Sequence, residues 1–378
     1  MRVLLTGGGT AGHINPAIAI AETIKERDPH AVIEYIGTPK GLENKLVGAM
    51  GIPMHHVKIM GISRSLHPKN VLAAYYIFTA PKAAKKIIKK FNPDVVIGTG
   101  GYVCWPAIRA ASELGIPTML HESNAVPGMA VKQLLPHTDE ILVNFAGTAK
   151  YLKGAKKITV VGNPLRRGFR AGNRAEARRA LGLTESDTMI LSFGGSLGAE
   201  MVNNACLDLM RDFSSKRGDI LHVHGTGARN YDKAKVKFDK MFKTAPENVR
   251  LLPYIDNMSD MMSAADIVIS RAGAMTISEL ALAGKASILI PSPNVTNDHQ
   301  YKNAKLLEES NAAILVTESA ELSSKLLHET EALYTDRGLR QLMQNRILRF
   351  ASRNSNDAIY TEIVRLVGAK KEKRKDSL

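Results

Sequence analysis

Short apolar runs alternate with longer segments of helical periodicity from one end of the chain to the other. The runs are rich in Val, Ile and Leu with little polar alternation, which is typical of strands buried on both faces of a parallel sheet. Helical patterns lie between most of them, so the chain is predicted to be an α/β protein with right-handed crossovers. The predicted strands are 3–5, 32–36, 57–59, 95–97, 118–120, 141–143, 159–161, 189–193, 220–223, 250–252, 267–269, 287–290 and 313–315.

The series of strands restarts near the middle of the chain. Gly162-Asn163-Pro164 interrupts it, and residues 189–199 repeat the arrangement that opens the chain, a strand followed by a glycine-rich loop and a helix. We therefore predict two doubly wound domains, 1–162 and 163–354, with ligands at the carboxyl ends of their strands. Two such domains facing each other would form a cleft. Helical patterns at 322–333, 338–350 and 357–366 close the chain.

The first strand leads into a loop with four glycines, followed by a helical pattern at 17–26 with Pro16 in its first turn. Backbone N–H groups at such a helix start attract anions. The spacing Gly7-x-Gly9-x-x-Gly12 also matches the dinucleotide fingerprint, which expects an acidic residue at the end of the second strand. Glu34 lies inside that strand, so we predict an anion site that binds neither nicotinamide nor flavin dinucleotides.

Four further loops at predicted strand ends are polar or glycine-rich: 98–102, 121–128, 193–199 and 270–279. Several such loops at one edge of two sheets favour a ligand that carries phosphates. Ser196 is placed to contact a phosphate or to cap a helix, and one residue can do both. Glu279 in the first turns of a helix is either stabilised by the helix dipole or accepts hydrogen bonds from a ribose.

Three side chains are candidates for acid–base chemistry. His13 follows the glycine loop directly, and His121 and Glu122 end the fifth predicted strand. For His121 a buried, neutral and purely structural role is equally consistent with its position. No Asp-x-Asp pair and no His/Cys group with zinc spacing occurs in the sequence, so we predict no metal site.

The charge of the chain indicates an anionic partner. The formal net charge is +15, which favours a polyanion or an anionic membrane face. Nucleic acid is disfavoured, because aromatic residues make up 5% of the chain and no nucleic-acid-binding motif is present. Two cysteines without a pattern, no signal peptide and no apolar run of 18 residues lead us to expect a cytoplasmic protein without a membrane span. The basic tail, 369–378, is predicted to be disordered.

One stretch combines apolar residues with lysines, as an interfacial membrane element does. The alternative is a helix that packs on the core and turns its lysines to water. The residues concerned are Leu72, Tyr75, Tyr76, Phe78, Lys82, Lys85, Lys86, Lys89 and Lys90.

Residues 7–17, Gly-Gly-Gly-Thr-Ala-Gly-His-Ile-Asn-Pro-Ala, resemble the opening motif of the MurG family of glycosyltransferases, in glycosyltransferase family 28. The resemblance continues in the family's order through 98–102, 121–124, 162–166, 194–199, 253–255, 270–279 and 298–304. It implies a GT-B fold of two Rossmann-like domains. It also implies inverting transfer of N-acetylglucosamine (GlcNAc) from UDP-GlcNAc to the C4 hydroxyl of the muramoyl sugar of lipid I. The product would be lipid II for cell-wall synthesis, with no metal required.

The resemblance also implies roles for individual residues. His13 and Glu122 are the candidates for base or acceptor orientation, and Gly100, Gly101, Tyr102 and His121 would contact the acceptor. Glu279 would bind the ribose, Ile255 the uracil and Gln300 the sugar, although His299 stands where some members have a first glutamine. The implied donor-binding residues are Thr10, Ala11, Gly12, Asn124, Arg166, Ser196, Ile255, Ala274, Met275, Thr276, Ile277, Ser278, Glu279 and Gln300.

The family further implies a peripheral location on the cytoplasmic face of the cell membrane, with other cell-wall synthesis and division proteins as partners. Domain 1–162 would bind acceptor and membrane, domain 163–354 would bind UDP-GlcNAc, and a helix at about 355–368 would cross back onto the first domain. Two alternatives stay open from the sequence: a UDP-GlcNAc 2-epimerase of similar fold, and a binding module without catalytic activity.

Overall fold

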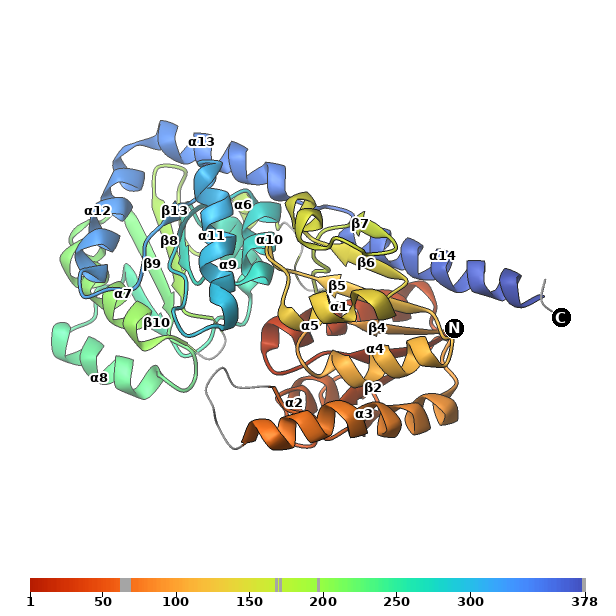
Figure 1. Cartoon of the computed structure of the whole chain (residues 1–378). Helices are drawn as coiled ribbons and strands as arrows, with labels where there is room; N and C mark the ends of the chain where they lie inside the picture. The colour runs from red at the N-terminus through yellow and green to blue at the C-terminus, as the bar shows by residue number, and fades with distance from the viewer. Residues whose placement is uncertain (62–68, 167–168, 170–171, 196–197, 376–378) are drawn as a thin grey trace. The chain divides into compact units, whose positions relative to one another are not determined.

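The computed structural model describes residues 1–61, 69–166, 169, 172–195 and 198–375 (Figure 1). The chain divides into two compact units. The first consists of Met1–Arg167 and Ser352–Leu378, and the second of Gly168–Ala351. Each unit is built on one parallel sheet, so the predicted fold class is confirmed.

The sheet of the first unit has seven strands in the order β3-β2-β1-β4-β5-β6-β7. The chain adds strands on one side of β1 and then returns to add them on the other, so the order reverses between β1 and β4. The strands are β1 Arg2–Thr6, β2 Val32–Gly37, β3 Met54–His56, β4 Val95–Gly98, β5 Thr118–Glu122, β6 Glu140–Val143 and β7 Ile158–Val160.

Helices cover both faces of this sheet. Val3 and Leu5 of β1 belong to the core on the face covered by α1, α2 and α14, whereas Leu4 belongs to the core under α3, α4 and α5. Neighbouring residues of a strand point to opposite faces, which explains the unbroken apolar runs of the sequence. The helices are α1 Ala11–Arg27, α2 Glu43–Gly48, α3 Lys69–Phe91, α4 Cys104–Glu113, α5 Met129–Leu134, η1 Leu135–His137, η2 Ala146–Tyr151 and α14 Ser355–Lys375.

The sheet of the second unit has six strands in the order β10-β9-β8-β11-β12-β13, and its order reverses between β8 and β11. The strands are β8 Thr188–Phe193, β9 Ile220–Gly225, β10 Val249–Leu252, β11 Ile267–Ser270, β12 Ala286–Leu289 and β13 Ile314–Leu315. The helices are α6 Arg174–Ala180, α7 Glu200–Asp212, η3 Ser214–Lys216, α8 Tyr231–Met241, α9 Met258–Ala264, α10 Ala274–Ala283, η4 Thr296–Asp298, α11 His299–Glu309, α12 Leu322–Thr335, α13 Arg337–Ile347 and η5 Leu348–Phe350.

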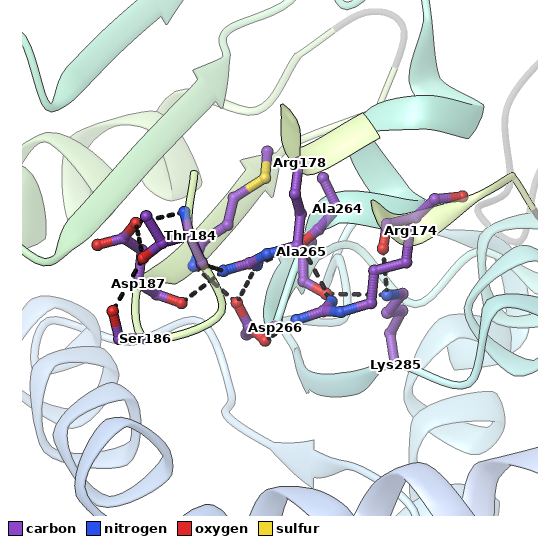
Figure 2. A network of polar contacts seen from close by, with 11 residues as sticks. Arg174, Arg178, Thr184, Ser186, Asp187, Ala264, Ala265, Asp266 and Lys285 are labelled. Atoms are coloured by element: carbon purple, nitrogen blue, oxygen red, sulfur yellow. Dashed lines mark hydrogen bonds and ion pairs between the residues drawn. The ribbon is translucent and has the colours of Figure 1, made fainter. Parts of the chain in front are cut away.

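A buried ionic network ties helices to the amino ends of strands in the second unit (Figure 2). The Arg178 guanidinium pairs with Asp266 at 2.9 Å and donates to the carbonyls of Ala264, Thr184 and Asp187. Asp266 also accepts from the Met189 backbone N–H at 2.8 Å. The last carbonyls of α9 therefore accept hydrogen bonds from cationic side chains, and positive charge stabilises the C-terminal end of a helix. Since the network precedes β8 and β11, it lies at the sheet edge opposite the glycine-rich loops.

The structure corrects three sequence predictions. The third strand is Met54–His56 instead of 57–59. The prediction was wrong because Val57 and Ile59 are apolar and buried in the core, although they follow the end of the strand. Helix α1 begins at Ala11, where the N–H of His13 and of Ile14 bond to the Thr10 carbonyl, so Pro16 lies inside the helix. Helix α14 continues to Lys375 through most of the segment predicted to be disordered. Its preceding turns are anchored in the core, and the basic segment contains neither Pro nor Gly to end it.

Candidate active site

In the first unit, the loops after β1 and β4 leave the sheet side by side, since these strands are neighbours where the strand order reverses. The Gly8 N–H donates to the Gly100 carbonyl at 3.4 Å. The Tyr35 hydroxyl donates to the Gly7 carbonyl at 2.6 Å from below the loop. Two of the loops predicted to bind ligand therefore form one structure.

His13 lies in the first turn of α1, and its ring rests on Gly100 and Gly101. These glycines have φ of +106° and +79°, and a Cβ atom on Gly100 would lie 2.6 Å from His13 Cδ2. His13 Nδ1 is 3.1 Å from the Gly8 carbonyl oxygen and 3.3 Å from the Thr10 hydroxyl. A bond to a carbonyl requires the proton on Nδ1, so the neutral ring carries its lone pair on Nε2. The ring is thus oriented as a proton acceptor through Nε2.

Glu122 ends β5, and its buried carboxylate organises the loop that follows. It accepts hydrogen bonds from the backbone N–H of Asn124 at 2.9 Å, from the Asn124 side chain at 3.0 Å and from the Gly128 N–H at 2.9 Å. Burial raises the pKa of Glu122, and these donors oppose that rise. The carboxylate holds Asn124, a predicted donor-binding residue, in place.

His121 is fully buried one residue earlier. Its Nε2 donates to the Gly162 carbonyl at 3.0 Å, and burial lowers the pKa of His121 to about 4. The ring is therefore neutral at pH 7. This geometry agrees with a structural role, because the fully buried side chain has no exposed atom that could contact an acceptor substrate.

Glu43 was missed by the sequence analysis, although it is completely buried beneath the first glycine loop. Its Oε1 accepts from the N–H of Thr38 at 2.9 Å and from the Thr38 hydroxyl at 2.7 Å. Its Oε2 has no hydrogen-bond partner among the described residues, and a Cβ atom on Gly8 would lie 3.0 Å from it. The sequence feature that could have indicated Glu43 is a carboxylate five residues after Thr38, close to Gly37 and Gly41.

The remaining predicted residues of the first unit lie at the loop surface. The Tyr102 ring is partly exposed and packs beside Gly9. Thr10 occupies the N-cap position of α1, and Ala11 and Gly12 lie in the first turn. Arg166 is exposed and pairs with Glu22 on α1 at 3.3 Å.

Helix α3 carries the lysine–aromatic stretch, and its exposed residues form one stripe, the α3 stripe. Val71, Tyr75 and Phe78 are 77%, 59% and 70% exposed, and they are followed at helical spacing by exposed Lys82, Lys86 and Lys89. Leu72 and Lys90 are also exposed beside the stripe. Tyr76 instead packs on the core, and Lys85 pairs with Glu113 at 2.5 Å. No helix within the described ranges is long and apolar enough to cross a membrane.

In the second unit, the corresponding loops follow β8 and β11, which are neighbours where its strand order reverses. Ser196 lies outside the described residues. The loop after β11 leads into α10, whose N-cap is Gly273. Ala274, Ile277 and Ser278 are buried on α10, whereas Met275, Thr276 and Glu279 are partly exposed.

Burial raises the pKa of Glu279 to about 7, so a neutral and a charged form coexist near neutral pH. Ile255 is buried against Gly225 at the end of β9. Gln300 accepts the Ser292 N–H at 2.9 Å through its side-chain oxygen. Beside this loop is a pocket of about 340 Å³, lined by Pro291, Ser292, Pro293, Asp298, Tyr301, Thr317 and Glu318.

Known proteins resemble the chain over nearly its whole length. Residues 3–143 match the glycosyltransferase family 28 N-terminal domain, and residues 189–357 match the C-terminal domain of that family. A protein of Acetivibrio thermocellus is 40% identical over 97% of this chain and 98% of its own length. A protein of Bacillus cytotoxicus is 41% identical over 88% of this chain and 90% of its own length. Both are named UDP-N-acetylglucosamine–N-acetylmuramyl-(pentapeptide) pyrophosphoryl-undecaprenol N-acetylglucosamine transferase.

Solved structures show the same fold. The crystal structure of MurG from Acinetobacter baumannii superposes with a TM-score of 0.76 at 29% identity, over 96% of this chain and 99% of that one. A UDP-GlcNAc 2-epimerase from Neisseria meningitidis, solved with UDP-GlcNAc bound, superposes with a TM-score of 0.62 at 14% identity, over 97% of this chain and 100% of that one. At such low identity the second likeness concerns the fold alone.

Proposed function

The chain belongs to glycosyltransferase family 28, and from this premise we infer that it is an N-acetylglucosaminyltransferase that uses UDP-GlcNAc as its donor substrate. It transfers GlcNAc to the C4 hydroxyl of the muramoyl sugar of lipid I and thereby forms lipid II for peptidoglycan synthesis. The observation that carries this conclusion is 40% identity to transferases of that name over 97% of the chain.

We propose that His13 is the general base. The reaction must remove a proton from the C4 hydroxyl as its oxygen attacks the anomeric carbon. With Nδ1 bonded to the Gly8 carbonyl, the His13 ring presents Nε2 as the proton acceptor. Glu122 was the other candidate, but its carboxylate already accepts three hydrogen bonds from its own loop. We assign Glu122 to the orientation of Asn124 and of the loop.

The leaving group is UDP, and its departing diphosphate gains negative charge. We propose that backbone N–H groups at the starts of α7 and α10 stabilise this charge, because helix N-termini favour anions. In this proposal the reaction needs no metal. Glu279 would accept hydrogen bonds from the ribose as a carboxylate, with Ile255 at the uracil and Gln300 at the sugar.

The predicted donor and acceptor residues are distributed over the two units. The predicted acceptor and catalytic residues belong to the first unit, together with the predicted donor residues Thr10, Ala11, Gly12, Asn124 and Arg166. The donor residues Ala274–Glu279, Ile255 and Gln300 belong to the second. We propose that the first unit provides most contacts to the lipid-linked acceptor and the second provides most contacts to the nucleotide sugar. This assignment follows the likeness to family members and the placement of the loops at the two points where strand order reverses.

We propose that the α3 stripe docks the protein on the anionic cytoplasmic face of the cell membrane. Its exposed apolar residues would enter the interface, and Lys82, Lys86 and Lys89 would meet anionic headgroups. Such docking would bring the first unit to its lipid-linked acceptor, and to other cell-wall synthesis proteins at the same surface.

The decisive experiment uses the full-length protein, UDP-GlcNAc, a short-chain lipid I analogue and EDTA. UDP release and a β-1,4-linked disaccharide lipid, formed only with acceptor present, are expected. UDP release without acceptor, together with N-acetylmannosamine, would instead identify an epimerase. Activity that disappears in EDTA and returns with a divalent cation would refute the proposed metal independence and leave the transferase assignment intact.

A further inference from the structure

Six buried polar groups of the second unit are joined in one hydrogen-bond chain, which runs from η3 to the loop after β9. Ser214 Oγ lies 2.9 Å from His222 Nδ1, and His222 Nε2 lies 2.8 Å from Ser192 Oγ. Ser192 Oγ lies 2.7 Å from His224 Nδ1, and His224 Nε2 lies 3.1 Å from Asn203 Oδ1. Asn203 Nδ2 then donates to the Thr226 carbonyl at 3.0 Å.

The direction of every bond in this chain follows from its last member. A carbonyl can only accept, so Asn203 must present its amide N–H₂ to Thr226 and its oxygen to His224. His224 therefore carries its proton on Nε2 and accepts from the Ser192 hydroxyl at Nδ1. Ser192 in turn accepts from His222 Nε2, and His222 accepts from Ser214. Burial lowers the pKa of His222 well below its ordinary value and that of His224 to about 4, so both rings are neutral.

The hydrogen-bond chain ends beneath the glycine-rich loop that follows β8, which is the second glycine-rich loop of the protein's repeated arrangement. A Cβ atom on Gly198, which has φ of +76°, would lie 2.0 Å from the Thr226 carbonyl oxygen, so the loop backbone rests directly on this peptide group. Asn203 also donates its own backbone N–H to the Ala199 carbonyl at 2.8 Å. One residue thus holds both the end of the loop and the carbonyl on which the loop is packed.

We propose that Asn203 and His224 are positioning residues for the donor diphosphate. They hold the Thr226 carbonyl and therefore set the backbone at Gly198 and Ala199, where α7 begins. This inference rests on the proposed function, in which N–H groups at the start of α7 bind the diphosphate. If the start of α7 is displaced by a fraction of an ångström, its N–H groups no longer point at the phosphate oxygens. Donor binding then weakens, while the acceptor contacts in the other unit are unaffected.

The test compares three substitutions, each of which breaks the hydrogen-bond chain at a different point. Asn203→Ala removes the bond to Thr226, Ser192→Ala breaks the middle of the chain, and Ser214→Ala breaks its far end. Each variant leaves buried polar groups unpaired, so all three lower the melting temperature. UDP affinity is measured by calorimetry on the folded variants, and KM is measured for UDP-GlcNAc and for the lipid I analogue.

We expect Asn203→Ala to weaken UDP binding and raise the KM for UDP-GlcNAc roughly tenfold, with the KM for the acceptor unchanged. Ser192→Ala has a smaller effect, and Ser214→Ala binds UDP like the wild type. Equal losses of UDP affinity in Asn203→Ala and Ser214→Ala, or no loss in Asn203→Ala, would overturn the proposal. A wild-type protein that binds UDP without transferring GlcNAc would contradict the proposed function and leave this comparison interpretable.

Asn203→Asp provides a second readout if the alanine variant does not fold. Its carboxylate can accept from His224 but cannot donate to the Thr226 carbonyl, whereas the protonated acid can do both. The ratio of its UDP affinity to that of the wild type is therefore expected to rise as the pH falls from 8 to 6. A ratio independent of pH would count against the assigned role of the Thr226 carbonyl.

Discussion

The two units place a glycine-rich loop at the same point of the same kind of sheet, but they support it with opposite chemistry. Beneath the first loop lies the buried carboxyl group of Glu43, one oxygen of which has no hydrogen-bond partner among the described residues. Beneath the second loop lies a chain of neutral groups in which each hydrogen bond determines the direction of the next. The first arrangement places a buried carboxyl group near the loop, and the second places side chains there that are neutral at pH 7.

This difference corresponds to the roles proposed for the two units. A unit that moves a proton benefits from a side chain that can accept one, and His13 is held by its bond to the Gly8 carbonyl of the first loop. A unit that holds a diphosphate benefits from fixed dipoles, because the orientation of its N–H groups decides the affinity. A repeated fold therefore supplies two equivalent edges, and the buried residues beneath each edge decide what it can do.

The largest effect on this comparison is expected from a substitution of His13. His13→Ala is expected to lower kcat by about 10²- to 10⁴-fold, because it removes the proton acceptor for the C4 hydroxyl. UDP affinity should fall far less than kcat, because most of the proposed donor contacts, including those to the diphosphate, are in the other unit. Steady-state kinetics and calorimetry on the same preparation check both statements. A loss of UDP affinity as large as the loss of kcat would show that the two functions are not divided between the units in this way.

The next largest effect is on stability, and it concerns the opposite edge of the second sheet. Asp266→Ala leaves the buried Arg178 guanidinium without its anionic partner, and removing one member of a buried ion pair costs roughly 3–5 kcal/mol. Urea unfolding of the second unit should show this decrease in the free energy of unfolding. Arg211→Ala, which removes an exposed partner of Asp212, is the control and should cost less than about 1 kcal/mol.

Glu279 is an exception, within the second unit, to the contrast between proton exchange and fixed dipoles. Burial raises its pKa to about 7, and the carboxylate accepts hydrogen bonds from the ribose hydroxyls more strongly than the protonated acid does. UDP affinity should therefore fall about tenfold as the pH is lowered from 8 to 6. Glu279→Gln should bind UDP more weakly at pH 8 and lose most of this pH dependence. An unchanged pH profile in the variant would argue against ribose binding by Glu279.

The smallest effects are expected at the membrane. Lys86→Glu and Lys89→Glu should each weaken binding to vesicles of anionic phospholipid by about fivefold or more, since one cation near such a surface contributes about 1 kcal/mol. Lys85→Ala is the matched control on the same helix, because Lys85 is already paired with Glu113. Co-sedimentation with vesicles measures the difference. Equal losses in Lys85→Ala and Lys89→Glu would remove the basis for an α3 stripe that acts as a surface.

The alternation of apolar runs and helical patterns is a local property, and the sequence alone was sufficient to predict it. Twelve of the thirteen predicted strands overlap the observed ones, and the third fails because the strand ends at His56, after which Val57 and Ile59 are buried in the core outside it. Glycine spacing at 7–12, 98–101 and 194–198 likewise marked the loops, since close backbone approach requires the absence of a side chain. The family resemblance supplied the reaction and the residue roles.

Only the tertiary structure decided which polar residues act together. Glu43 and Gly8 are separated by 34 intervening residues, and Ser192, Asn203, His222 and Thr226 come from different elements. Periodicity cannot reveal such contacts, because it reports which face of an element is buried and not what the element is packed against. The same holds for Lys85, which looks like its neighbouring lysines in the sequence and is distinguished by its pairing with Glu113. Partners for buried hydrogen bonds come from distant segments, so the identity of each partner is a property of the fold.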